Sequence, residues 1–227
     1  MTDLSNISAI LFDFDGVIAH TIPIFRQAMF RFFREKNLSV TESDFEADGW
    51  ASKSLAQFCA ILSEQYDIHL EVQELRTQIW QTQVDLINAG LESDPSLIPF
   101  LEYCKASGIL IAIGSNSFWD RVEWVIKKMN IDTYFRHDIE HPEQWYNIIG
   151  ANDLIHHKPN PEVWIKCAEM LGVSLHECLV IEDGLPGLTG AKTCGARSIY
   201  YHRFCRPEKA CIEIAEKSVE SFSELIW

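Results

Sequence analysis

Four short segments of the sequence carry polar side chains that could together bind a metal ion and a phosphate group. Carboxylate oxygens are the hard ligands that Mg²⁺ prefers, with water and substrate phosphate completing its shell. A lysine and a hydroxyl can hold the anionic oxygens of a phosphate. The set predicts a magnesium and phosphate pocket if the fold brings the segments together. The residues are Asp13 and Asp15 in LFDFDGV, Ser115 and Asn116 in SNS, Lys158 in KPNP, and Glu182 and Asp183 in EDGLPG.

The elements around these segments predict an α/β fold that would gather them. Short apolar runs with polar or glycine boundaries are typical of strands covered on both faces, and they alternate here with helical patterns. This alternation predicts a Rossmann-like, doubly wound parallel sheet, in which ligands bind beyond the carboxyl ends of the strands. The expected strands are 7–14, 109–114, 178–181 and 196–201, and the expected helices are 97–107, 118–129, 161–171 and 186–194.

One region interrupts the alternation. Between residues 22 and 91 the sequence contains amphipathic helical stretches and no convincing strand. We therefore expect a core domain formed by residues 1–19 and 92–227, with a helical cap domain, residues 20–91, inserted after the first strand.

Composition limits which binding partners and which cellular compartment we expect. The chain has 227 residues, 47% of them hydrophobic, and a formal net charge of −14. This charge argues against a nucleic acid partner, and no apolar stretch approaches the roughly 20 residues that a membrane span needs. Seven scattered cysteines without a C-x-x-C pair are typical of reduced thiols. We expect a cytoplasmic protein, a monomer or weak dimer, that acts on a small phosphorylated metabolite.

The ordered set DFDGV, SNS, KPNP and EDGLPG resembles the four motifs of the haloacid dehalogenase-like hydrolase superfamily. The helical insertion is similar to the cap of its phosphatase and beta-phosphoglucomutase-like branch. The resemblance implies a Mg²⁺-dependent phosphatase that hydrolyses a small phosphomonoester, such as a sugar phosphate, through an aspartyl-phosphate. It covers the first 20 or so residues and approximately residues 95–201.

The resemblance also implies a role for each acid of the first motif. Asp13 would be the nucleophile and a metal ligand. Asp15 would be the general acid and base, protonating the leaving oxygen and then activating water, while its backbone carbonyl faces the metal.

The other motifs would bind phosphate and metal. Ser115, Asn116 and the turn at Gly16 would hold the phosphoryl oxygens, with the amino end of the following helix. Lys158 would bridge Asp13 and the phosphate. The remaining expected metal ligands are Asp183, which would bind Mg²⁺ directly, and Glu182, which would bind it through water.

Three features depart from the family pattern or fall outside it. Gly184 stands where the family often has a serine, and Phe25 stands where the beta-phosphoglucomutase pattern has a histidine. In the insertion, DGWASKSL resembles the cap's specificity loop, so Trp50 and Lys53 could reach the leaving group. The segment 137–157, which includes Trp145, is longer than the family's usual connection, and either a site rim or a contact surface would explain it.

Two alternative functions stay open. A beta-phosphoglucomutase-like enzyme would transfer the phosphoryl group to a sugar hydroxyl, and Phe25 argues against it. A catalytically inactive binding or regulatory protein would keep the fold only. A dehalogenase would leave the acidic pair Glu182 and Asp183 unexplained, because that chemistry needs no magnesium.

Overall fold

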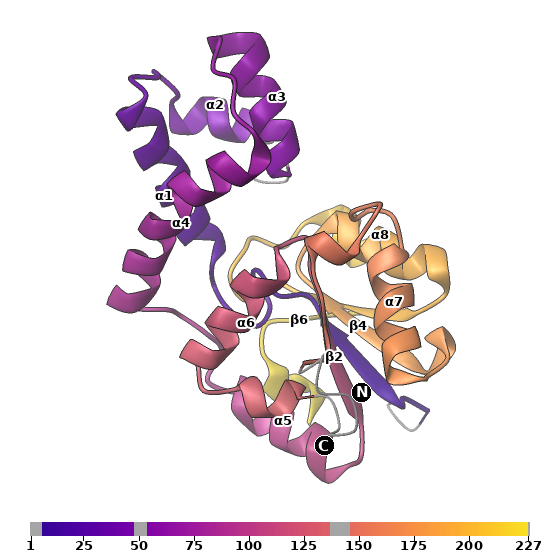
Figure 1. Ribbon diagram of the computed structural model, residues 1–227. Coiled ribbons are helices and arrows are strands. Elements are labelled where there is room, and N and C mark those ends of the chain that lie inside the picture. Colours follow the sequence, from indigo (N-terminus) through magenta and orange to yellow (C-terminus); the bar gives the residue numbers. More distant parts are fainter. Residues whose placement is uncertain (1–5, 48–53, 137–145, 227) are drawn as a thin grey trace. The chain divides into compact units, whose positions relative to one another are not determined.

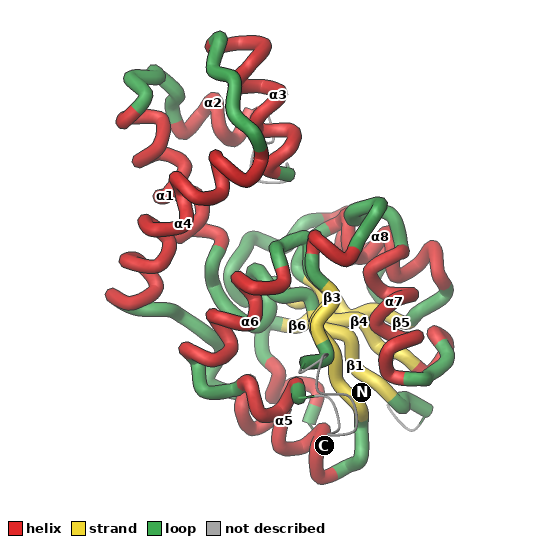
Figure 2. The backbone as a smooth tube through the Cα atoms, in the orientation of Figure 1, coloured by secondary structure: helices red, strands yellow, loops and turns green. Residues whose placement is uncertain are grey.

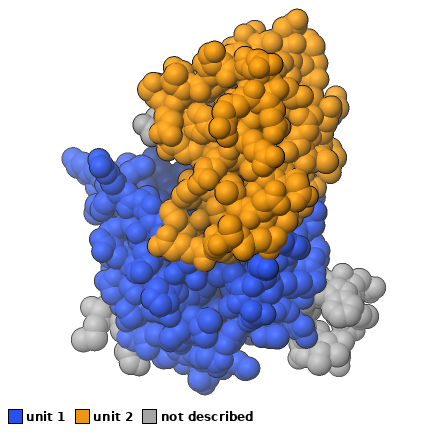
Figure 3. All heavy atoms as spheres, turned by 90° about the vertical axis from the view of Figure 1, so that its left-hand side faces the viewer, with its two compact units in different colours: residues 1–19, 93–227 blue, residues 20–92 orange. Residues whose placement is uncertain are grey.

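A computed structural model describes residues 6–47, 54–136 and 146–226 of the chain. The chain divides into two units, residues 1–19 with 93–227 and residues 20–92, coloured separately in Figure 3. Among the described residues, no helix is both long enough and apolar enough to cross a membrane.

The larger unit is built on a parallel sheet, drawn in yellow in Figure 2. Its strand order is β3-β2-β1-β4-β5-β6. This arrangement confirms the predicted doubly wound α/β core. The four predicted strands are present, and two short strands, β3 and β6, were not predicted. The strands are β1 (Ala9–Phe12), β2 (Leu110–Gly114), β3 (Ile148–Ile149), β4 (Cys178–Glu182), β5 (Arg197–Tyr201) and β6 (Lys217–Val219).

Helices cover both faces of this sheet (Figure 1). On one face, Trp164 and Cys167 of α7 pack with Leu11 of β1 and Val180 of β4. On the other, the ring of Phe12 meets three aromatic rings edge to face, those of Phe100, Phe135 and Phe222. The helices of this unit are α5 (Leu97–Ala106), α6 (Trp119–Lys128), α7 (Glu162–Leu171), α8 (Leu185–Cys194) and α9 (Lys209–Ile214), with 3₁₀ turns at Asp132–Phe135, Ala151–Asp153, Leu175–Glu177 and Phe222–Leu225.

The register of the central strands sets where the motifs lie. Phe12, the last residue of β1, is level with Ile113 of β2 and Ile181 of β4. Because all three strands are parallel, the residues that follow them emerge at the same edge of the sheet. The first, second and fourth motifs therefore meet at the carboxyl ends of β1, β2 and β4.

The smaller unit is helical in its described residues. It contains α1 (Ile22–Glu35), α2 (Glu42–Ala47), α3 (Leu55–Tyr66) and α4 (Val72–Ala89). Its core is formed largely by phenylalanines and leucines, including Phe32, Phe58, Leu62 and Leu75. At the start of α3, the hydroxyl of Ser54 accepts the N–H of Gln57 while the Gln57 side chain accepts the N–H of Ser54, a capping box that stabilises the helix start.

Candidate active site

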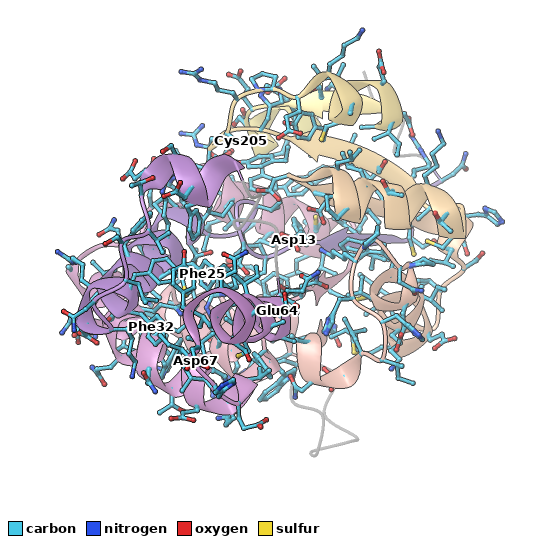
Figure 4. All side chains as sticks on the ribbon, turned by 90° about the horizontal axis from the view of Figure 1, so that it is seen from above. Asp13, Phe25, Phe32, Glu64, Asp67 and Cys205 are labelled. Carbon is cyan, nitrogen blue, oxygen red and sulfur yellow. The ribbon has the colours of Figure 1, made fainter. Side chains whose placement is uncertain are left out.

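Asp13 occupies the position directly after the central strand β1. Its N–H donates to the carbonyl oxygen of Ile181 on β4 at 2.8 Å, so the strand pairing continues through this residue and fixes its backbone. The side chain is almost completely buried, with 7% of its residue surface exposed. Figure 4 labels Asp13 among the side chains of the sheet.

Lys158 connects this aspartate to the end of β4. Its ammonium donates to Oδ1 of Asp13 at 2.5 Å and to Oε2 of Glu182 at 2.8 Å. The ammonium also lies 4.2 Å from the ring centre of Trp164, a favourable cation–π geometry. Burial acts to lower the pKa of Lys158, but the carboxylates of Asp13 and Glu182 outweigh it and raise that pKa. The lysine therefore stays charged.

Three carboxyl groups converge here with one lysine to balance them. Oxygens of Asp13, Glu182 and Asp183 all lie within 4.8 Å of one another. Burial, followed by the charge of Glu182, raises the pKa of Asp13 to about 7, although Lys158 opposes the change. Burial and the charges of Glu182 and Asp13 also raise the pKa of Asp183 well above its usual range. This excess of buried negative charge, offered by oxygen ligands alone, fits a hard divalent cation.

Glu182 is held by several donors at once. Its Oε1 accepts the N–H of Asp183 at 3.2 Å and the N–H of Gly184 at 3.1 Å, while Oε2 accepts from Lys158. A side chain at Gly187 would place its Cβ 1.8 Å from Oε2, so only glycine leaves room for the carboxylate. The first turn of α8 is thus shaped around Glu182.

Asp15 belongs to a separate hydrogen-bonded group. Its Oδ2 accepts the hydroxyl of Ser117 at 2.6 Å, and its Oδ1 accepts Nη1 of Arg121 at 2.8 Å. The same Nη1 lies 2.8 Å from the Ser117 hydroxyl oxygen, to which it donates. Neither Ser117 nor Arg121 was singled out from the sequence. The available signal was an arginine on the apolar face of α6, which also buries Val122, Val125 and Ile126.

The expected phosphate-binding residues take different places. Ser115 is buried, and its hydroxyl accepts the N–H of Ser117 at 3.0 Å. Oδ1 of Asn116 accepts the N–H of Lys158 at 3.1 Å and so joins the second motif to the third. Gly16 has φ of 89°, a conformation that favours glycine, and its N–H donates to Ala19 within the turn.

The described part of the segment 137–157 supports the second motif. The N–H of Ala151 donates to the carbonyl oxygen of Ser117 at 2.8 Å, and Asn152 accepts the N–H of Trp119 at 2.9 Å. A Cβ at Gly150 would lie 2.6 Å from the Trp119 nitrogen, so the two backbones pack in direct contact. Trp145 lies outside the described residues.

The pattern of the family described as haloacid dehalogenase-like hydrolases matches residues 7–195, which contain all four motifs. The chain belongs to this family. The match confirms the resemblance inferred from the motifs. Some relatives of the chain are named phosphatases.

Its relatives in the family differ greatly in length. The chain is 25% identical over 87% of its length to Protein SUPPRESSOR OF QUENCHING 1, chloroplastic, of Arabidopsis thaliana, of which it spans only 18%. It is 22% identical over 85% of its length to the Phosphorylated carbohydrates phosphatase of Thermotoga maritima, of which it spans 83%.

Solved structures of family members share the fold. CbbY from Rhodobacter sphaeroides in complex with phosphate superimposes with a TM-score of 0.79 at 22% identity and 96% coverage of both chains. A putative beta-phosphoglucomutase from Thermotoga maritima gives 0.72 at 21% identity and 94% coverage of both. At these identities the likeness establishes the architecture, including the helical cap of such hydrolases.

Two departures from the family pattern, Gly184 and Phe25, can be placed in the structure. Gly184 lacks a hydroxyl but contributes its N–H to Glu182. Phe25 packs on Phe58 inside the helical unit, with ring centres 5.8 Å apart, and is labelled in Figure 4. Trp50 and Lys53, the expected residues of the specificity loop, lie outside the described residues.

Proposed function

We propose that this chain is a magnesium-dependent phosphatase that hydrolyses a small phosphomonoester through an aspartyl-phosphate formed on Asp13. The observation that supports it most is the cluster of Asp13, Lys158, Glu182 and Asp183 at the ends of β1 and β4. Asp13 and Glu182 are buried, and Asp183 is partly exposed. Lys158 offsets only part of this negative charge, and a bound cation would offset the rest.

The proposed roles combine these contacts with the resemblance to the family. Asp13, Asp183 and Glu182 would hold Mg²⁺, Glu182 through water, and the backbone carbonyl of Asp15 would join them. When bound, the ion offsets the repulsion between carboxylate and phosphate. Lys158 favours the ionised form of Asp13 by contacting Oδ1, which leaves Oδ2 to attack phosphorus.

Two further groups complete the reaction. Asp15 donates a proton to the leaving oxygen and later removes one from water, which hydrolyses the intermediate. Ser115 and Asn116 position the phosphoryl group together with the amino end of α6 and the turn at Gly16. The substrate class is a sugar phosphate or similar metabolite, consistent with the name of the Thermotoga maritima relative. Lys53 as a contact to the leaving group, the cytoplasmic location and the oligomeric state stay predictions.

A phosphate-release assay on the purified chain tests this proposal. We expect release from members of a panel of phosphorylated metabolites in the presence of Mg²⁺, and none after addition of EDTA. Asp13→Asn should abolish release, because an amide cannot attack phosphorus. The matched control is Asp67→Asn, since Asp67 is an exposed aspartate of the helical unit with φ of 55°, which asparagine tolerates.

Two outcomes would contradict the proposal. Undiminished turnover in Asp13→Asn would contradict the role of Asp13 as nucleophile, and release that continues in EDTA would contradict the magnesium dependence. No release across the panel would favour the inactive binding protein. The mutase alternative is tested in the same reactions, because a mutase yields an isomerised sugar phosphate in place of inorganic phosphate. Phe25, in the position of the mutase histidine, leads us to expect inorganic phosphate.

A further inference from the structure

Arg121 is a buried cation that the motifs do not account for. Its side chain is 10% exposed, and Nη1 lies 2.8 Å from Oδ1 and 3.1 Å from Oδ2 of Asp15. The guanidinium also lies 5.7 Å from the ring centre of Phe14, the residue between the two acids of the first motif. A cation this far out of water needs a partner that offsets its desolvation, and the Asp15 carboxylate provides it.

Ser117 makes the contact a three-membered group. The hydroxyl donates to Oδ2 of Asp15 and accepts from Nη1 of Arg121, so each of the three side chains contacts the other two. Both Asp15 oxygens are therefore held, each by a different donor. A carboxyl group held at both oxygens cannot turn about its terminal torsion, which is otherwise broad.

The group is anchored on rigid elements. Arg121 lies in the first turn of α6, and the carbonyl oxygen of Ser117 accepts the N–H of Ala151 just after β3. The direct backbone packing of Gly150 against Trp119 fixes the same loop from the other side. Both donors to Asp15 thus come from one supported segment, 102 and 106 residues away in the sequence.

We propose that Arg121 is a positioning residue that, together with Ser117, holds the Asp15 carboxyl in the orientation needed to transfer a proton to the leaving group. The inference rests on the proposed phosphatase function and concerns the step in which Asp15 protonates the leaving group. In that step the bond from Asp13 to phosphorus forms, the bond from phosphorus to the leaving oxygen breaks, and Asp15 in its protonated form gives its proton to that oxygen and becomes the carboxylate that Arg121 and Ser117 contact in the structure. General acid–base groups act only within hydrogen-bond reach of the atom they serve, so orientation determines their effect.

A series of aryl phosphates tests this inference. Phenyl phosphate has a basic leaving group that needs a proton, whereas 4-nitrophenyl phosphate has a leaving group that departs without one. Arg121→Met removes both the charge and the donors at similar length. We expect kcat/KM, which depends on formation of the aspartyl-phosphate and not on its later hydrolysis, to fall about 100-fold for phenyl phosphate in this variant and less than about tenfold for 4-nitrophenyl phosphate.

Variants separate positioning from folding. Arg121→Lys keeps a donor and a charge and should recover part of the lost kcat/KM for phenyl phosphate. Arg197→Met is the matched control, because Arg197 forms an ion pair with Glu216 elsewhere in the same unit and should leave both rates unchanged. If Arg121→Met does not fold, Ser117→Ala removes the donor to Oδ2 with little loss of volume and should give a smaller change of the same kind.

The outcomes distinguish this inference from the function it rests on. Equal losses of kcat/KM for both aryl phosphates in Arg121→Met would show that the arginine is merely structural and would overturn the inference. If Arg121→Met does not fold, the same result in Ser117→Ala would overturn it. The phosphatase proposal would stand, provided that Asp13→Asn is inactive. A wild-type chain that releases no phosphate from either compound would overturn both.

Discussion

Replacing Lys158 by methionine should destabilise the protein strongly and in a pH-dependent way. The lysine contacts Asp13 and Glu182 at 2.5 and 2.8 Å, and all three side chains are less than 10% exposed. Removing one partner of a buried ion pair costs about 3–5 kcal/mol, since it leaves uncompensated charge in the interior. For a chain of this size, that loss lowers Tm by roughly 6–20 °C, at about 2–4 °C per kcal/mol.

The sign of the pH dependence follows from the carboxyl groups left behind. The pKa of Asp13 is about 7 in the folded chain against 3.8 for the free side chain, and loss of Lys158 removes a group that lowers it. Folding therefore takes up protons between these values, and the stability of the folded state falls as pH rises through this window. The penalty of Lys158→Met should be small near pH 4 and should grow toward pH 8.

Thermal unfolding in EDTA at pH 5 and pH 8 measures both quantities. The matched control is Lys209→Met, because Lys209 is 89% exposed and lies 3.6 Å from Glu213, a surface pair worth less than about 1 kcal/mol. A Tm loss in Lys158→Met no larger than in Lys209→Met would refute the reasoning about the buried charges. Equal losses at the two pH values would refute the reasoning about Asp13.

Two further predictions concern other parts of the larger unit. Gly187→Ala should weaken Mg²⁺ binding by about 10–100-fold, because the added Cβ displaces the carboxylate of Glu182. Gly184→Ala is the control and should leave Mg²⁺ binding unchanged, because its Cβ would lie 3.6 Å from that carboxylate. Calorimetric titration with Mg²⁺ compares the two variants. Asp94→Ala should cost about 3 kcal/mol at pH 7, because buried Asp94 accepts hydrogen bonds from Ser96, Tyr201 and Phe222. Burial acts to raise the pKa of Asp94, but these hydrogen bonds outweigh it and lower that pKa. The stability cost of Asp94→Ala should therefore shrink as pH falls below 3.8, the pKa of the free side chain. Urea unfolding at pH 7 and pH 3 measures the difference.

The main strands were predictable because buried strands consist of continuous runs of apolar residues, which are visible in the sequence. The run at 178–181 became β4, whose residues are all buried, and the run at 7–14 became β1. The two edge strands were not predictable, because β3 has two residues and β6 has three, which are too few to show a hydrophobic period. Their strand conformation depends on the neighbours β2 and β5, which a single sequence does not reveal.

The motif residues were predictable as a set, whereas their connections were not. Because β1 and β4 are parallel, Asp13 and Asp183 lie at the same edge of the sheet, and the α/β alternation predicts a parallel sheet. The pairing of Arg121 with Asp15 spans 106 residues and has no local signature except a charged residue on the buried face of a helix. The need for glycine at position 187 likewise arises only from the placement of Glu182.

The central place of β1 has a consequence for the chain during synthesis. β1 precedes both of its sheet neighbours, so AILF leaves the ribosome with two unpaired edges, and its second neighbour is complete only when residue 182 has emerged. Until then this tetrapeptide is the kind of segment that joins other nascent chains in aggregates or recruits chaperones. The negative charges of Asp13 and Asp15, which follow this segment, oppose such association while the chain is still unfolded.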